Sequence, residues 1–204
     1  MPSFSLAYRI AHSHIYVHRR ALVSRRCGGS HDAEAQAALA YALAGDAAHA
    51  QSRADDLAKR FPLDTVVQSV WLPTVRARIE TGRKNPARSI ELLQAAVPDE
   101  LGVLGGGIAN SCLYPVYARA EAYLSARQGS QAAVEFQKIL DHRGVVSNEP
   151  IGALAHLGLA RAYAMQDDTA KALAAYQDFL TLWKDADADI PVLKQAKVEY
   201  AKLQ

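Results

Sequence analysis

The chain has 204 residues, of which 50% are hydrophobic and 22% charged, a composition that can bury a sizeable core and excludes disorder as the default state. Its formal net charge is only +2, and its two cysteines stand apart without a CxxC partner, which argues against a disulfide framework or a zinc site. No apolar run approaches the roughly 20 residues that cross a bilayer, so a soluble chain without a membrane span is expected.

The positive charge is concentrated at the start of the chain. Residues 1–31 hold five arginines and no acidic residue, which leaves 18 of the 23 basic residues and all 21 acidic ones in the rest. Residues 1–30 are interpreted as an atypical basic leader, either disordered or a degenerate helix. Contact of this leader with nucleic acid or a membrane is the alternative. No basic stripe follows the leader, so no nucleic-acid partner is expected.

A first pair of helices is predicted over about residues 32–62. Its first helix, 34–43, ends at Gly45, a residue that can adopt the left-handed conformation found at helix ends. Asp46 is expected to cap the second helix by offering its carboxylate to exposed backbone amides. One face of this second helix carries small and apolar residues, namely Ala50, Ala54, Leu57 and Phe61.

A second pair is predicted over about 66–98, and two alignments with the first pair compete. If Gly82 is matched with Gly45, Ala87 falls opposite Ala50. If the cap Asn85 is matched with Asp46, Ser89 falls there instead. The cap alignment is preferred because it places apolar residues where the helix needs them. The expected buried stripe is Ile90, Leu93 and Val97.

Two further pairs are predicted over about 113–142 and 150–184. The pair over 150–184 repeats residues of the pair over 113–142 at a constant offset of 40 positions, which is hard to obtain by chance. The matched positions are Tyr123 and Tyr163, Phe136 and Tyr176, and Leu140 and Leu180. In the last pair, Asp167-Asp168 replaces the glycine expected at the turn. A final amphipathic helix over 191–203 is predicted to cap the array.

Residues 99–112 separate the second pair from the third. They contain three consecutive glycines, 105–107, and are not expected to form regular structure. The segment is interpreted as a flexible connector, with a lid or binding loop as the alternative. It lacks the Gly-Lys-Ser/Thr of a phosphate loop, so no cofactor is predicted.

The recurring Ala, Tyr, Gly, Ala, aromatic and Pro positions resemble the tetratricopeptide repeat over about residues 31–184. More specifically, residues 148–204 look like the C-terminal repeats of bacterial eukaryotic-like serine/threonine protein kinases, as do 45–64 and 136–143. The resemblance implies an all-α, right-handed superhelix of about four antiparallel helix pairs plus a C-terminal capping helix, together forming one repeat domain over 31–204.

The kinase domain itself is missing from the sequence. There is no Gly-rich loop after a strand, no catalytic-loop Asp…Asn and no Asp-Phe-Gly. Asp141-His142-Arg143 has the letters of a catalytic loop in the wrong order and is interpreted as a helix end. A non-enzymatic module is expected. The alternative is an enzyme: a serine/threonine protein kinase or a fragment of one, or a hydrolase that uses Cys112.

A histidine cluster and one cysteine are the candidate chemical sites. His12, His14 and His18 have helical spacing, with Cys27 and His31 nearby, but no carboxylate lies among them, so no metal site is predicted. Cys112 lies between a glycine-rich segment and a helix but lacks a partner base, so no catalytic residue is predicted. Three further histidines, His49, His142 and His156, are expected on helix surfaces or ends.

The sequence therefore favours a non-catalytic scaffold that binds a protein or peptide in a concave groove. The resemblance implies the sensor or recruitment arm of a bacterial signalling protein, cytoplasmic as written or extracytoplasmic if the parent is anchored in a membrane. Packing between repeats is the favoured alternative role for Trp71 and Tyr117. The predicted groove residues are Trp71, Arg78, Tyr114, Tyr117, Glu121 and Arg161, with Asp32, Leu39 and Leu157 beside them.

Overall fold

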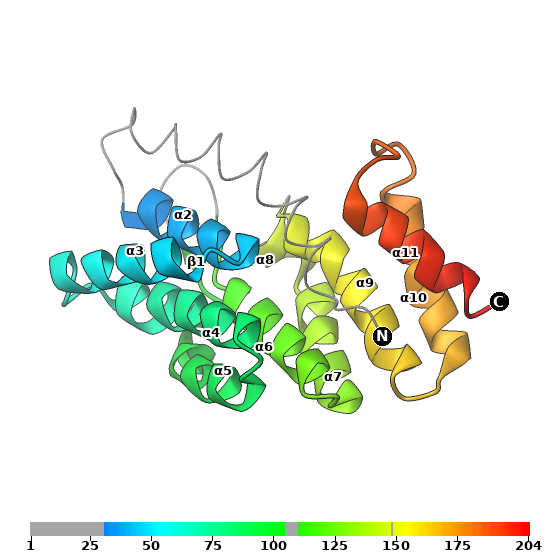
Figure 1. Cartoon of the computed structure of the whole chain (residues 1–204), viewed down its shortest axis with the longest axis horizontal. Coiled ribbons are helices and arrows are strands. Elements are labelled where there is room, and N and C mark those ends of the chain that lie inside the picture. Colours follow the sequence, from blue (N-terminus) through cyan, green and yellow to red (C-terminus); the bar gives the residue numbers. More distant parts are fainter. Residues whose placement is uncertain (1–30, 105–109, 148) are drawn as a thin grey trace. The chain divides into compact units, whose positions relative to one another are not determined.

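The computed structural model describes residues 31–104, 110–147 and 149–204. Within these ranges the regular structure is helical, apart from one pair of two-residue strands (Figure 1). The prediction of an all-α protein is therefore confirmed. The chain divides into two compact units between Asp99 and Glu100, and each unit is described by itself.

The first unit consists of helices that pack on their neighbours in the chain. Helix α2 packs against α3 and α4, and α4 packs against α5. A π-helix, η1, leads directly into α4, and a 3-10 helix, η2, follows α5. The elements are α2 (His31–Ala44), α3 (Ala47–Arg60), η1 (Val66–Trp71), α4 (Leu72–Gly82), α5 (Pro86–Leu93) and η2 (Gln94–Asp99).

The second unit begins with the short antiparallel pair β1 and β2, in which Val103 is opposite Ser111. The segment expected to lack regular structure thus forms a strand pair at its described ends. Helix α7 packs against both α6 and α9, α9 packs against α10, and α10 against α11. The elements are β1 (Val103–Leu104), β2 (Asn110–Ser111), α6 (Tyr114–Ser125), α7 (Gly129–Asp141), α8 (Arg143–Val146), α9 (Pro150–Ala164), α10 (Thr169–Leu182) and α11 (Pro191–Ala201).

Four turns between helices in the described ranges share one backbone geometry. In each, a residue with positive φ follows a helix, and the N–H of the next residue donates to a carbonyl five positions earlier, as in a Schellman motif. The positive-φ residues are Gly45, Lys84, Arg127 and Asp167, with φ between 60° and 80°. The hydrogen bonds are Asp46 to Tyr41, Asn85 to Glu80 and Gln128 to Tyr123 at 2.9 Å, and Asp168 to Tyr163 at 3.1 Å.

This geometry decides between the two alignments of the second pair. Lys84, and not Gly82, occupies the left-handed position that corresponds to Gly45. Ser89 is fully buried whereas Ala87 is exposed, as the cap alignment requires. The predicted cap at Asp46 is also confirmed, because its carboxylate accepts a hydrogen bond from the His49 N–H at 3.1 Å.

The predicted buried stripe of the second pair is wrong at its end. Leu93 is buried and Ile90 is half-buried, but Val97 is 45% exposed and Ala96 is buried in its place. The chain changes from an α-helix to the 3-10 helix η2 at Gln94. Because a 3-10 helix has three residues per turn, the residue that follows Leu93 on the buried face is three positions later and not four.

Residues that are 40 positions apart in the third and fourth predicted pairs have the same degree of burial. Phe136 and Tyr176 are both buried, and the other two pairs, Tyr123 with Tyr163 and Leu140 with Leu180, are all half-buried. Helices α7 and α10 thus present matching residues to their surroundings, as do α6 and α9. The internal repeat predicted for this part of the chain is reflected in its packing.

Arg127→Gly is expected to stabilise the fold by about 0.5–1 kcal/mol, because Arg127 is exposed and held at φ 62°, where a side chain is unfavourable. The melting temperature should rise by about 1–4 °C. The matched control is Arg53→Gly in the exposed interior of α3, which should lose about 1 kcal/mol. Thermal unfolding of both variants checks this, and a loss in both would contradict the strain at Arg127.

Candidate functional site

The predicted groove residue Trp71 lies in the interior of the first unit. Its side chain is 1% exposed, and its Nε1–H donates to Asp32 Oδ1 at 3.0 Å. Trp71 ends the π-helix, whose widened turn is marked by a hydrogen bond from the Leu72 N–H to Val67 O. This burial agrees with a packing role for Trp71, which was the favoured alternative to a role in the groove.

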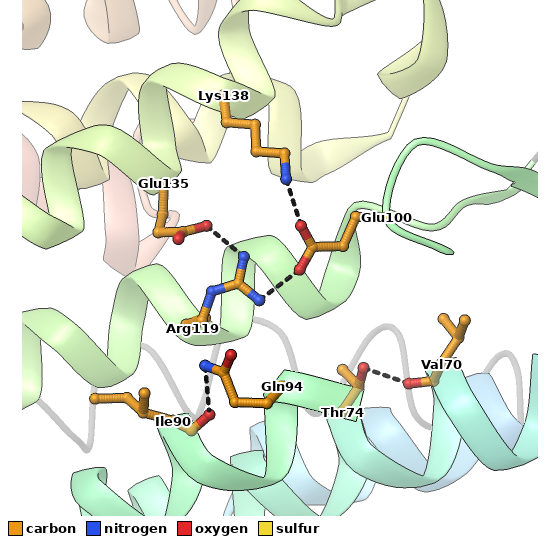
Figure 2. A network of polar contacts seen from close by, with 8 residues as sticks. All are labelled: Val70, Thr74, Ile90, Gln94, Glu100, Arg119, Glu135 and Lys138. Atoms are coloured by element: carbon orange, nitrogen blue, oxygen red, sulfur yellow. Dashed lines mark hydrogen bonds and ion pairs between the residues drawn. The ribbon is translucent and has the colours of Figure 1, made fainter. Parts of the chain in front are cut away.

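The π-helix has a local cause in the sequence. Pro73 lacks an N–H, and in a regular α-helix its ring would collide with the carbonyl four residues earlier, so the widened turn relieves the contact. Thr74 Oγ1 donates to the Val70 carbonyl at 2.6 Å, which satisfies an acceptor in this turn (Figure 2). Arg78 follows Thr74 by one turn of α4 and is half-buried.

In the second unit, three predicted groove residues lie on α6. Tyr117 is buried with its ring edge-on to Phe136, 5.8 Å between centroids, and its hydroxyl donates to Glu121 Oε1 at 3.3 Å. Tyr114 and Glu121 are half-buried. Of these three side chains, Tyr114 and Glu121 are therefore the better placed to meet a partner.

Arg161, the sixth predicted groove residue, is bound to the last helix. Its side chain is 15% exposed, with Nε and Nη2 donating to the two oxygens of Glu199 on α11 at 2.9 and 3.2 Å. Tyr176 and Gln195 donate to the same carboxylate at 3.0 and 2.8 Å. Burial, followed by the charge of Glu199, raises the pKa of Tyr176, so its hydroxyl stays a donor.

The charged residues of α11 have different environments. Lys194, Lys197 and Lys202 are exposed, whereas Glu199 is half-buried and bound to Arg161 on α9 and Tyr176 on α10. Amphipathicity within one helix does not reveal a carboxylate whose partner is 38 residues away.

A second polar cluster was not predicted at all. Glu100, at the start of the second unit, accepts hydrogen bonds from Arg119 on α6 and Lys138 on α7, and Arg119 also donates to Glu135 at 2.7 Å (Figure 2). The Glu100 side chain is only 1% exposed. Each of the four side chains is bound to at least one other member of the cluster. We therefore interpret the cluster as a structural contact and not as a catalytic site.

The candidate metal and catalytic residues lie in different parts of the chain. His12, His14 and His18 lie outside the described residues. Cys112 is buried. Across the described ranges, no group of three or more His, Cys, Asp or Glu side chains is placed to hold a metal ion, and no helix there is long and apolar enough to cross a membrane.

The expectation that His156 lies on a helix surface or end is wrong. His156 is in the middle of α9 and only 9% exposed, with Nδ1 3.6 Å from Asp178 Oδ2. Burial lowers its pKa, and Arg143 adds to this, whereas Asp178 opposes it. The imidazole is therefore held in its neutral form at neutral pH.

The buried imidazole should make stability depend on pH. Because the folded state binds the His156 proton less readily than the unfolded state, stability is complete above about pH 6.5 and falls as pH falls below it towards the lowered folded pKa. Urea unfolding at several pH values between 7.5 and 5 checks this. His156→Gln should flatten this dependence relative to the wild type. Equal slopes in the two proteins would contradict the role of His156.

No protein-family model matches the chain, and a search of curated proteins finds no match either. The function proposed below therefore rests on the residues and contacts of this chain.

Proposed function

We propose that the chain is a tetratricopeptide-like scaffold that binds a protein or peptide and has no catalytic activity of its own. The observation that carries the proposal is the shared geometry of the four turns, whose caps Asp46, Asn85, Gln128 and Asp168 follow one another at 39, 43 and 40 residues. A recurring turn between packed helices is typical of helical repeat arrays, which usually present a surface for binding.

In the proposed architecture, four antiparallel helix pairs form a right-handed superhelix, with α11 as the capping helix. The matched environments of α7 and α10 support the repeat, and the bond between Glu199 and Arg161 supports the capping role of α11. In such arrays the first helix of each pair lines the concave side. These helices are α2, α4, α6 and α9.

The partner is proposed to contact the predicted groove residues that keep part of their surface. Arg78, Tyr114 and Glu121 are half-buried, and their types suit peptide anchoring through a forked donor, an aromatic ring and a carboxylate. Trp71, Tyr117 and Arg161 are each bound within their own unit, to Asp32, Glu121 and Glu199 respectively.

The resemblance to repeats of bacterial serine/threonine kinases suggests the biological setting. We propose that the scaffold acts as the sensing or recruiting arm of a signalling protein of that kind. Phosphate transfer by the purified chain, incubated with ATP and a general protein substrate, would contradict the absence of catalysis.

Selection of peptides from a displayed random library tests the binding function directly. The affinity of selected peptides is measured by fluorescence anisotropy against the wild type and against Arg78→Gln, Tyr114→Ala and Glu121→Gln. Each substitution is expected to weaken binding by about tenfold or more, since a few anchors carry most of the affinity.

Matched controls distinguish loss of contact from loss of fold. Arg53→Gln, Tyr123→Ala and Glu91→Gln remove the same residue types at positions outside the predicted groove and should leave the affinity unchanged. The proposal fails if the library yields no binder, or if groove and control variants bind equally well.

A further inference from the structure

A second candidate site lies in the second unit, on the side formed by α7, α8, α9 and α10. A cavity of about 540 Å³ opens there, within the size range of small-molecule sites. Most of its lining surface is apolar. Its lining includes Ile139, Arg143, Val146, His156, Asp178 and Leu182.

The short helix α8 shapes one wall of this cavity. Val146 is buried, and it lies so close to α9 that a Cβ on Gly152 would be 2.8 Å from Val146 Cγ1. Ser147 then reverses the chain with φ 51° and ψ −121°, and the Glu149 N–H donates to Val146 O at 3.1 Å across the turn. A non-glycine residue held in this conformation is strained, and such strain clusters at binding sites.

The charged side chains that line the cavity differ in whether they already contact another polar group. Asp178 has the imidazole of His156 at 3.6 Å, and Glu149 is not free either. Arg143 is exposed, and within the part of the chain that the structure describes its guanidinium has no ion pair or hydrogen bond. The cavity thus combines apolar walls with a guanidinium that makes no hydrogen bond or ion pair within the described residues.

A guanidinium binds a carboxylate through two parallel hydrogen bonds, and this geometry is its most specific pairing. We propose that the cavity binds a small amphipathic monocarboxylate, with the carboxylate on Arg143 and the apolar body against Ile139, Val146 and Leu182. This site is independent of the groove in the proposed function, so either proposal can fail without the other.

Sodium octanoate is the probe for this site, with octanol and octylamine as ligands of the same chain length. Calorimetry on the full chain should show octanoate as the tightest of the three. The amide signals of Gly152 and Ala153 in α9 should shift on titration of the ¹⁵N-labelled protein, whereas those of α2 to α5 should not.

Arg143→Gln should weaken octanoate binding by about tenfold or more, as expected for loss of a charged hydrogen bond, and leave octanol binding unchanged. Arg53→Gln, at an exposed position on α3, is the matched control and should bind octanoate as the wild type does. Octylamine binding as tightly as octanoate would assign recognition to Asp178 and overturn the proposal. So would an unchanged affinity of Arg143→Gln, the absence of octanoate binding, or signal shifts outside the cavity.

Discussion

Arg119→Met is expected to lower the free energy of unfolding by about 3–5 kcal/mol, the usual cost of removing one partner from a buried ion pair. Methionine fills a similar volume but leaves the Glu100 carboxylate, 1% exposed, with Lys138 as its remaining charged partner. The second carboxylate, Glu135, loses its bond to Arg119 as well. Urea unfolding measures the loss, and exposed Arg88→Met serves as the control, with an expected change within about 0.5 kcal/mol.

The pH dependence of this loss identifies its origin. Burial by itself raises the pKa of Glu100, but the hydrogen bonds and charges of Arg119 and Lys138 outweigh burial and lower the pKa. Since the folded pKa is below the unfolded value, the contribution of Glu100 is complete above about pH 4.5 and lost as pH falls through the folded pKa.

In the Arg119→Met variant the pKa of Glu100 should be higher than in the wild type, because burial disfavours the charged carboxylate and the opposing effect of Arg119 is lost. The difference in stability from the wild type should therefore be largest near neutral pH and shrink in acid. The double variant Glu100→Gln/Arg119→Met should recover part of the loss at neutral pH, because the buried charge is gone. A single-variant loss below about 1 kcal/mol, or one that grows in acid, would show that the cluster is not desolvated.

Gly158→Ala is expected to destabilise the protein by about 1–3 kcal/mol through overpacking. A Cβ at this position on α9 would lie 2.2–2.6 Å from three ring carbons of Phe136 on α7. In a helix interior the same substitution normally stabilises by about 1 kcal/mol, so the sign of the effect tests the contact. The two helices are packed at this point to the limit that glycine allows.

Gly144→Ala on α8 is the matched control for this prediction, because a Cβ there would meet no atom within 4 Å. Its stability should be equal to or above that of the wild type. A second substitution, Phe136→Leu, should make Gly158→Ala less costly than it is alone, because the ring that it strikes is gone. Thermal unfolding of the wild type, the three single variants and the double variant checks both points, and a stabilised Gly158→Ala variant would rule out the close approach of α7 and α9.

Local signals predicted the helices and their turns well. The cap at Asp46 and the left-handed turn residue Gly45 follow from side-chain chemistry within a few positions, and the cap alignment of Asn85 was resolved correctly for the same reason. The π-helix before Pro73 and the 3-10 helix after Leu93 were not predicted. Both are short helices with a different number of residues per turn. Over a single turn, the hydrophobic period of an α-helix cannot be told apart from theirs.

Long-range polar contacts could not be predicted from the sequence. Glu100 lies in a glycine-rich connector and gives no local sign that Arg119 and Lys138 will enclose it. Arg161 was expected in the groove because of its position on a first helix, but its partner Glu199 is contributed by the last helix. For His156, helical spacing alone could not reveal that α8 and α10 would cover it.

The bond between Arg161 and Glu199 has a consequence for which helix can pack beside α9 and α10. Unpartnered apolar helix faces tend to recruit helices of other molecules, and so favour fibres or exchange of segments. In the second unit, α11 packs against α10, and a competing helix would have to displace its Glu199 carboxylate from the half-buried guanidinium of Arg161. The position therefore selects a helix that carries a matching charge and not merely an apolar face.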